Sequence, residues 1–180
     1  KSGMTVLDIG TGPGSIPLYL KQLYPDIGFT GLDISMGMLE KAKENKKLLR
    51  REVNLLAGNG EALPFKPQTV DAVTLFFALH HMDRPGHLLK EIDRVLKPNG
   101  LFLAIDFRRD MPGWLYHTLN GLWQGVFFFS NGRFGIRESI QAAWRPVEIE
   151  TVLRDTKLKG FAVHENLMEL WIHKGIVNSK

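Results

Sequence analysis

Residues 5–15, TVLDIGTGPGS, constrain the fold most, because a short apolar run there meets three glycines at alternate positions. The apolar run, with Asp8 near its end, is typical of a buried strand. The glycines permit a tight turn with positive φ and close approach of the backbone to a ligand; they are Gly10, Gly12 and Gly14. A helix is expected to follow over residues 14–24.

A strand, a glycine turn and a helix N-terminus together predict a site for a nucleotide-like ligand. Free N–H groups and the helix dipole point at the space above the strand end. The spacing departs from the dinucleotide fingerprint G-x-G-x-x-G, because the position that would complete that pattern is Ser15. The phosphate-binding loop G-x-x-x-x-G-K-[ST] is absent as well. A glycine turn of this kind can also be purely structural.

Length and composition narrow the class of protein. The chain has 180 residues, 44% of them hydrophobic, which predicts a single domain over residues 1–180 with one core. It has no apolar run of about 18 residues and no signal-peptide pattern at its start, so a cytoplasmic protein is expected. The absence of cysteine excludes disulfides, thiolate metal sites and cysteine nucleophiles. A net charge of +4 does not argue for a nucleic-acid partner, and none is expected.

Apolar segments that alternate with helical patterns predict an α/β fold with a doubly wound, mostly parallel sheet and helices on both faces. Four further strands are expected, separated by helices, at residues 28–34, 52–58, 70–79 and 100–107. The last of the separating helices is expected over residues 85–97, and Pro146 opens another. Two closing strands at residues 161–164 and 167–173 would pair antiparallel at one sheet edge, which makes seven strands.

A second informative carboxylate, Asp33, ends the second predicted strand. In nucleotide-binding α/β folds an acid here accepts hydrogen bonds from two ribose hydroxyls, although a strand-end or capping role is the alternative. Ser35 is expected to cap the next helix. Asn59, Gly60 and Glu61 follow the third strand, so they are expected at the carboxyl edge of the sheet, where ligands bind.

Residues 111–145 form an aromatic-rich segment that is expected to begin as a helix. Its aromatic residues include Trp114, Tyr116, Trp123, Phe127, Phe128, Phe129 and Phe134. The segment could cap a hydrophobic or planar acceptor. It could equally belong to the core or form the surface of a homodimer, because aromatic side chains usually pack inside.

Nearly the whole chain resembles the S-adenosylmethionine-dependent methyltransferases with a seven-stranded sheet, in the small-molecule branch that includes the quinone-biosynthesis C-methyltransferases. The matching motifs, in order, are VLDIGTGPG, GLDIS, GNGEALPF, FALHHM and RVLKPNGLF. The resemblance implies methyl transfer from S-adenosyl-L-methionine to a small-molecule acceptor, with S-adenosyl-L-homocysteine as product. The family has one or two lid helices before the first strand. This sequence lacks them, and truncation is the expected reason.

The resemblance also implies a set of cofactor-binding residues: Asp8, Gly10, Thr11, Gly12, Asp33, Ile34, Met38, Asn59, Gly60 and Phe76. Residues 10–12 would wrap the methionine part of the cofactor, Asp8 would brace the loop, and Asp33 would hold the ribose. Ile34 and Met38 would pack on the adenine. Asn59 stands where the family usually has Asp as acceptor for the adenine amino group; the amide oxygen can still accept, but it carries no charge.

Methyl transfer from a sulfonium depends mainly on alignment and exclusion of water, and a general base is needed only if the acceptor must lose a proton. His80 is the first candidate because it follows the fourth strand and imidazole titrates near neutrality; His81 is the second. Both could instead shape the substrate pocket or simply pack. A metal cluster of His80, His81, Asp83 and His87 fits no common zinc spacing, so no metal is expected.

The missing cysteine also sets aside the cytosine or uracil C5 methyltransferases and the arsenic methyltransferases, which use that residue. The Asn/Asp-Pro-Pro-aromatic motif of adenine amino methylation is replaced by FFAL. A small-molecule acceptor is therefore favoured. Two alternatives of other classes stay open: an NAD-dependent oxidoreductase, which the glycine spacing disfavours, and a cofactor-binding protein without catalysis of its own.

Overall fold

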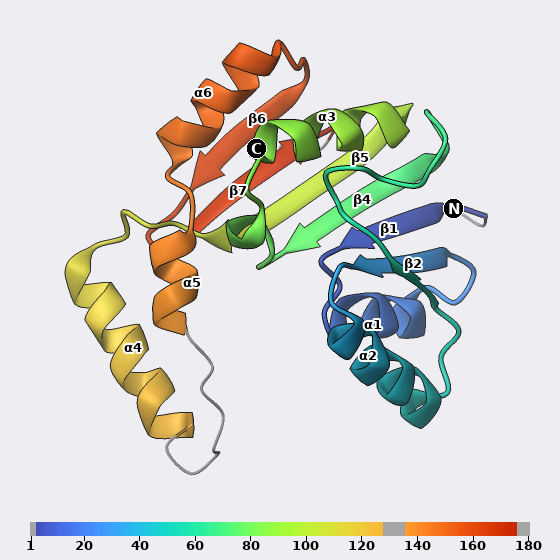
Figure 1. Cartoon of the computed structure of the whole chain (residues 1–180), viewed down its shortest axis with the longest axis horizontal. Helices are drawn as coiled ribbons and strands as arrows, with labels where there is room; N and C mark the ends of the chain where they lie inside the picture. Colours follow the sequence, from blue (N-terminus) through green and yellow to red (C-terminus); the bar gives the residue numbers. More distant parts are fainter. Residues whose placement is uncertain (1–2, 128–135, 176–180) are drawn as a thin grey trace.

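The computed structural model describes residues 3–127 and 136–175 (Figure 1). Within them, seven strands form one sheet in the order β3-β2-β1-β4-β5-β7-β6. The strands are β1 (Thr5–Ile9), β2 (Gly28–Asp33), β3 (Asn54–Ala57), β4 (Val70–Phe76), β5 (Leu96–Phe107), β6 (Phe161–Glu165) and β7 (Glu169–Lys174). Strands β1 to β5 pair in parallel, and β7 pairs antiparallel with both β5 and β6. The predicted mostly parallel sheet with an antiparallel edge is confirmed.

Helices cover both faces of the sheet, so alternate strand side chains enter separate apolar layers. On one face Leu18 of α1 (Ser15–Leu23) packs with Phe29 of β2, and α2 (Met36–Leu49) lies beside α1. On the other face α3 (Pro85–Val95) and α6 (Pro146–Thr156) cover the sheet. The fully buried residues of α3 there are Leu88, Leu89, Ile92 and Val95.

Helix α2 begins where the sequence predicts, because Ser35 caps it by accepting the main-chain N–H of Met38. Several predicted boundaries are wrong; the fifth strand, for example, begins at Leu96 and not at residue 100. The fourth strand ends at Phe76, not at residue 79, because Phe77 has a φ of +50° and the chain then turns into the short 3-10 helix η1 (Leu79–His81). Helix α3 ends at Val95, because Leu96 already pairs with Val70 as the start of β5.

Residues 58–69 connect β3 to β4 without a helix, so the expectation that helices separate all five strands is wrong at this connection. Two charged side chains of α3 hold this loop instead. Arg94 donates to the carbonyls of Leu63 (3.0 Å) and Phe65 (2.8 Å), and Glu91 accepts the main-chain N–H of Leu63 (2.8 Å). The loop is therefore fastened to the face of the sheet that α3 covers.

After β5 the chain leaves the sheet in two helices, α4 (Gly113–Phe127) and α5 (Ile136–Ala142) (Figure 1). Met111, Ile136 and Ile140 form a small core there, while Trp114 is 65% exposed. The predicted helical start of the aromatic segment is confirmed. The side chains of residues 123–135 lie outside the described part, so a cap, core or dimer role remains a prediction. None of the helices described has the length and apolar character needed to cross a membrane.

Candidate functional site

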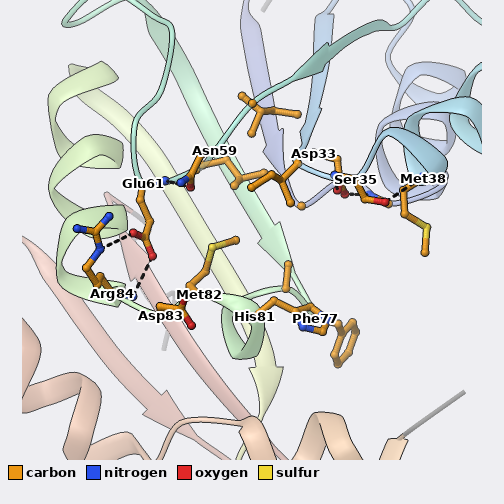
Figure 2. Close-up of a pocket in the computed structure, with 18 of the residues that line it drawn as sticks. Asp33, Ser35, Met38, Asn59, Glu61, Phe77, His81, Met82, Asp83 and Arg84 are labelled. Atoms are coloured by element: carbon orange, nitrogen blue, oxygen red, sulfur yellow. Dashed lines mark hydrogen bonds and ion pairs between the residues drawn. The ribbon is translucent and has the colours of Figure 1, made fainter.

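A cavity of about 870 Å³ opens at the carboxyl ends of β1, β2 and β4. This volume lies within the range of roughly 300–1,000 Å³ typical of small-molecule sites. Its wall comprises the glycine turn, the end of β2, the start of α2, the loop after β3 and the segment around η1. Figure 2 shows Asp33, Ser35 and Met38 on one side of the cavity, apart from His81 and Phe77.

The turn after β1 needs glycine at two positions for different reasons. Gly10 has a φ of +66°, and a Cβ on it would lie 2.4 Å from the Cβ of Ala78. Gly12 has a φ of +54°, and a Cβ on it would stand in open space. Because both glycines line the cavity, the turn packs closely at Gly10 and leaves room for a ligand against the backbone at Gly12.

Asp8 and Thr11 lie behind the cavity wall and hold the turn in place. The Asp8 carboxylate accepts the hydroxyls of Thr11 and Thr74, both at 2.7 Å. Thr11 packs so closely against Gly31 that a Cβ added to Gly31 would lie 2.6 Å from the Oγ1 atom of Thr11. Burial raises the pKa of Asp8 to about 6, against the lowering effect of the two hydroxyl hydrogen bonds. These contacts suit the bracing role predicted for Asp8.

Asp33 ties the end of β2 to the glycine turn. Its Oδ2 accepts the main-chain N–H of Gly12, and its Oδ1 accepts that of Ser35, both at 2.8 Å. The carboxylate lines the cavity. Each oxygen can accept a second hydrogen bond, so Asp33 can still take two hydroxyl groups from a ligand.

The predicted adenine side of the cavity is formed by Ile34, Met38 and Asn59. Ile34 is 74% exposed although it is apolar, which suits a wall that a flat ring would cover. The Oδ1 atom of Asn59 accepts the main-chain N–H of Glu61 at 2.9 Å. A carbonyl oxygen has a second lone pair, so this amide can still accept from an amino group. Gly60 also lines the wall, whereas Phe76 is not among the lining residues and Phe77 is.

Glu61 and Arg84 join two loops at the rim of the cavity (Figure 2). The Glu61 carboxylate accepts the main-chain N–H of Arg84 at 2.9 Å and its Nε–H at 2.8 Å. Burial acts to raise the pKa of Glu61, but these hydrogen bonds and the charge of Arg84 outweigh it and hold the pKa below its ordinary value. Sequence reasoning missed Arg84, because no local pattern indicates a partner 23 residues away.

The two histidines of η1 occupy different positions. His81 lines the cavity, whereas His80 is 8% exposed and lies behind the wall. The Nδ1 atom of His80 lies 2.9 Å from Oδ1 of Asp106, and the two imidazole rings are 4.1 Å apart between centroids. Partial burial and the neighbouring His80 lower the pKa of His81. The geometry therefore favours His81 over His80 for direct contact with a ligand, in the reverse order of the sequence-based ranking.

The residues on the wall fit the adenosyl cofactor that the resemblance implies. Open space over Gly12 admits the chain of a ligand, Asp33 offers acceptors for two hydroxyls, and Asn59 offers an acceptor beside the apolar Ile34. Within residues 3–127 and 136–175, no group of three or more acidic or histidine side chains is placed to hold a metal ion.

A family profile described as "Methyltransferase domain" matches residues 7–104, which is more than half of the chain. A ubiquinone/menaquinone biosynthesis C-methyltransferase of Desulfotalea psychrophila is 37% identical over 101 residues, 56% of this chain and 40% of that protein. A demethylmenaquinone methyltransferase of Listeria welshimeri is 36% identical over 118 residues, 63% of this chain and 50% of that protein. The chain thus spans half or less of the length of these curated relatives.

The fold is also similar to solved structures. A SAM-dependent methyltransferase from Aquifex aeolicus superposes with a TM-score of 0.70 at 23% sequence identity, over 97% of this chain and 82% of that chain. The similarity covers both the parallel strands and the antiparallel edge, because nearly every residue of this chain is included.

Proposed function

Because the chain belongs to the methyltransferase domain family, within the S-adenosylmethionine-dependent class, we propose that it transfers a methyl group from S-adenosylmethionine to a small-molecule acceptor. The observation that carries the proposal is the position of Asp33. Its carboxylate faces the cavity and holds the glycine turn through Gly12, so acceptors for ribose hydroxyls and an open backbone surface occur side by side.

At the cofactor end, the chain's own groups would bind by shape and hydrogen bonding. Asp33 would accept the ribose hydroxyls, and Asn59 would accept the adenine amino group with its remaining lone pair. Ile34 and Met38 would pack their apolar side chains against the adenine base. Gly12 would leave room for the methionine part. Bound S-adenosylmethionine supplies a methyl group on a positively charged sulfur, which is an activated leaving group.

At the acceptor end, the wall is formed by His81 with Phe77, Ala78 and Met82. These apolar groups would align a flat acceptor and exclude water from it, which favours an in-line displacement. His81 would take a proton from an acceptor that has to lose one, because its lowered pKa keeps the imidazole neutral near pH 7. His80 stays the second candidate for this role.

The acceptor that this wall fits best is a planar, largely apolar molecule such as a phenol or a quinol. The support is twofold: aromatic and thioether groups lie beside His81, and the relatives described above are named for ubiquinone, menaquinone or demethylmenaquinone. A dimer formed through residues 111–145, a cytoplasmic location and the absence of a nucleic-acid partner stay predictions.

The test is a methyl-release assay with methyl-labelled S-adenosylmethionine and a panel of phenols, quinols and amines. We expect label in a phenol or quinol product, and loss of most of it in His81→Ala but not in the exposed His87→Ala. Binding of S-adenosylhomocysteine without transfer to any acceptor would instead favour a cofactor-binding protein without catalysis. Transfer only to amines would contradict the planar phenol or quinol acceptor.

A further inference from the structure

A buried carboxylate behind the cavity wall has no role in the proposed function so far. Asp106 lies near the end of β5 and is 2% exposed. It accepts three different N–H groups: the main-chain N–H of His80 (3.0 Å), the main-chain N–H of Phe107 (2.7 Å) and Nδ1 of His80 (2.9 Å). A carboxylate is acceptor-only, so it matches three donors where an amide or a hydroxyl would not.

These contacts determine which ring nitrogen of His80 carries the hydrogen and how the ring is oriented. Because the facing Asp106 oxygens only accept, Nδ1 of His80 must carry a hydrogen. The neutral ring then has its lone pair on Nε2, and the ring plane cannot rotate without loss of the hydrogen bond. A carboxylate that fixes the tautomer and orientation of a histidine is a recurring way to prepare an imidazole for proton chemistry.

The same contacts hold the backbone that carries His81. Asp106 bonds the main-chain N–H of His80, and the turn continues with His81 N–H to Ala78 C=O (3.1 Å) and Met82 N–H to Leu79 C=O (3.0 Å). The His80 ring lies against the His81 ring, with 4.1 Å between centroids. The orientation of His81 on the cavity wall thus depends on a carboxylate 25 residues further along the chain.

We infer that Asp106 is a positioning residue for the acceptor end of the cavity: it holds the ring and main chain of His80, and through them directs His81 toward the acceptor. The inference rests on the proposed function, since it assigns Asp106 a task in the same reaction. It predicts that loss of the carboxylate lowers turnover while the cofactor end, formed by Asp33 and the glycine turn, is unchanged.

The first test is Asp106→Asn, with the exposed Asp110→Asn as matched control. The amide keeps one acceptor oxygen but replaces the other oxygen by an N–H₂ donor, so at least one of the three N–H groups that Asp106 accepts, on the main chain or on the His80 ring, then faces a donor. Nitrogen-15 NMR should show His80 as the Nδ1–H tautomer in the wild-type protein, and a change of its ring or main-chain signals in Asp106→Asn but not in Asp110→Asn. We expect kcat to fall at least tenfold, and the affinity for S-adenosylhomocysteine to change less than threefold. Unchanged His80 signals or an unchanged kcat in Asp106→Asn would overturn the inference.

A second pair of variants decides the question if Asp106→Asn fails to fold. His80→Asn keeps an N–H near the place of Nδ1 and can still donate to Asp106, whereas His80→Leu cannot. Positioning predicts that His80→Asn retains at least a third of kcat and that His80→Leu loses at least tenfold. Equal losses would overturn the inference and point to His80 itself as the base. If the wild-type protein transfers no methyl group to any acceptor, the proposed function fails, and the NMR spectrum still decides whether Asp106 fixes the His80 ring.

Discussion

The Asp33 carboxylate accepts the main-chain N–H of Gly12 at 2.8 Å and so joins the ends of two neighbouring parallel strands at the cavity. This single contact sets the distance between the carboxylate and the glycine turn. A ligand that bonds to Asp33 is therefore held against the open backbone at Gly12. The account of cofactor binding depends on this pair.

Replacement of Asp33 should weaken the cofactor site more than the fold. Asp33→Ala removes the acceptors for two hydroxyls, and charge-assisted hydrogen bonds of this kind contribute about 1–3 kcal/mol. We expect the affinity for S-adenosylhomocysteine, measured by calorimetry, to fall about 5- to 150-fold. The control is Asp26→Ala, which removes an exposed carboxylate from the loop before β2. Equal affinities for wild type and Asp33→Ala would rule out the ribose role.

The glycine turn should not tolerate a side chain at Gly10. Gly10→Ala forces a Cβ to within 2.4 Å of the Ala78 Cβ at a φ of +66°, which should lower the free energy of unfolding by about 2–4 kcal/mol. The double variant Gly10→Ala/Ala78→Gly should recover the part of this loss that comes from the overlap between the two Cβ atoms. Gly113→Ala, whose Cβ would meet open space, is the control. Urea unfolding measures all of these, and an undiminished stability of Gly10→Ala would contradict the packing described.

Replacement of His80 or His81 by alanine should lower turnover to different extents, and neither replacement should change cofactor binding. A general base contributes about 10²- to 10⁴-fold, so His81→Ala should lower kcat about 100-fold with an acceptor that loses a proton. His80→Ala should slow turnover less, since its ring acts on His81 from behind the wall. Neither change should alter the affinity for S-adenosylhomocysteine. Loss of cofactor binding in either variant would show that the base assignment is wrong.

Stability should respond to the titration of Asp8. Burial raises its pKa to about 6 in the folded chain, from 3.8. Between these values the folded chain keeps a proton that the unfolded chain has released, so the free energy of unfolding decreases as pH rises from about 4 to 6. Asp8→Asn cannot titrate. The difference between the free energies of unfolding of Asp8→Asn and the wild-type protein should therefore increase by about 2–3 kcal/mol between pH 4 and pH 6. A difference that stays constant between pH 4 and pH 7 would contradict the raised pKa.

Much of the fold could be predicted because its signals are local. The strand that carries Asp8, the turn at Gly10 and Gly12 and the cap at Ser35 each depend on residues within a few positions of one another. The end of the fourth strand could not be predicted, because the long apolar run of residues 70–79 indicates burial but not where a strand ends. The end is set by the positive φ of Phe77, which places Phe77 on the cavity wall and leaves Phe76 off it.

The site was predictable in its ligand class and less so in its side chains. Asp33, Asn59 and His81 are all on the cavity wall, because each follows a strand whose carboxyl end meets the same sheet edge. The partners of the polar groups were not predictable. Asp106 bonds His80 across 26 positions and Glu61 bonds Arg84 across 23, and no periodicity relates residues so far apart.

Calorimetric titration of the wild-type protein with S-adenosylhomocysteine and, in parallel, with NADH tests the central claim most directly, since both ligands carry an adenosine that could reach Asp33. The geometry of the glycine turn predicts saturable, one-site binding of S-adenosylhomocysteine and no heat from NADH. Binding of NADH with no binding of S-adenosylhomocysteine would contradict the claim and favour an oxidoreductase.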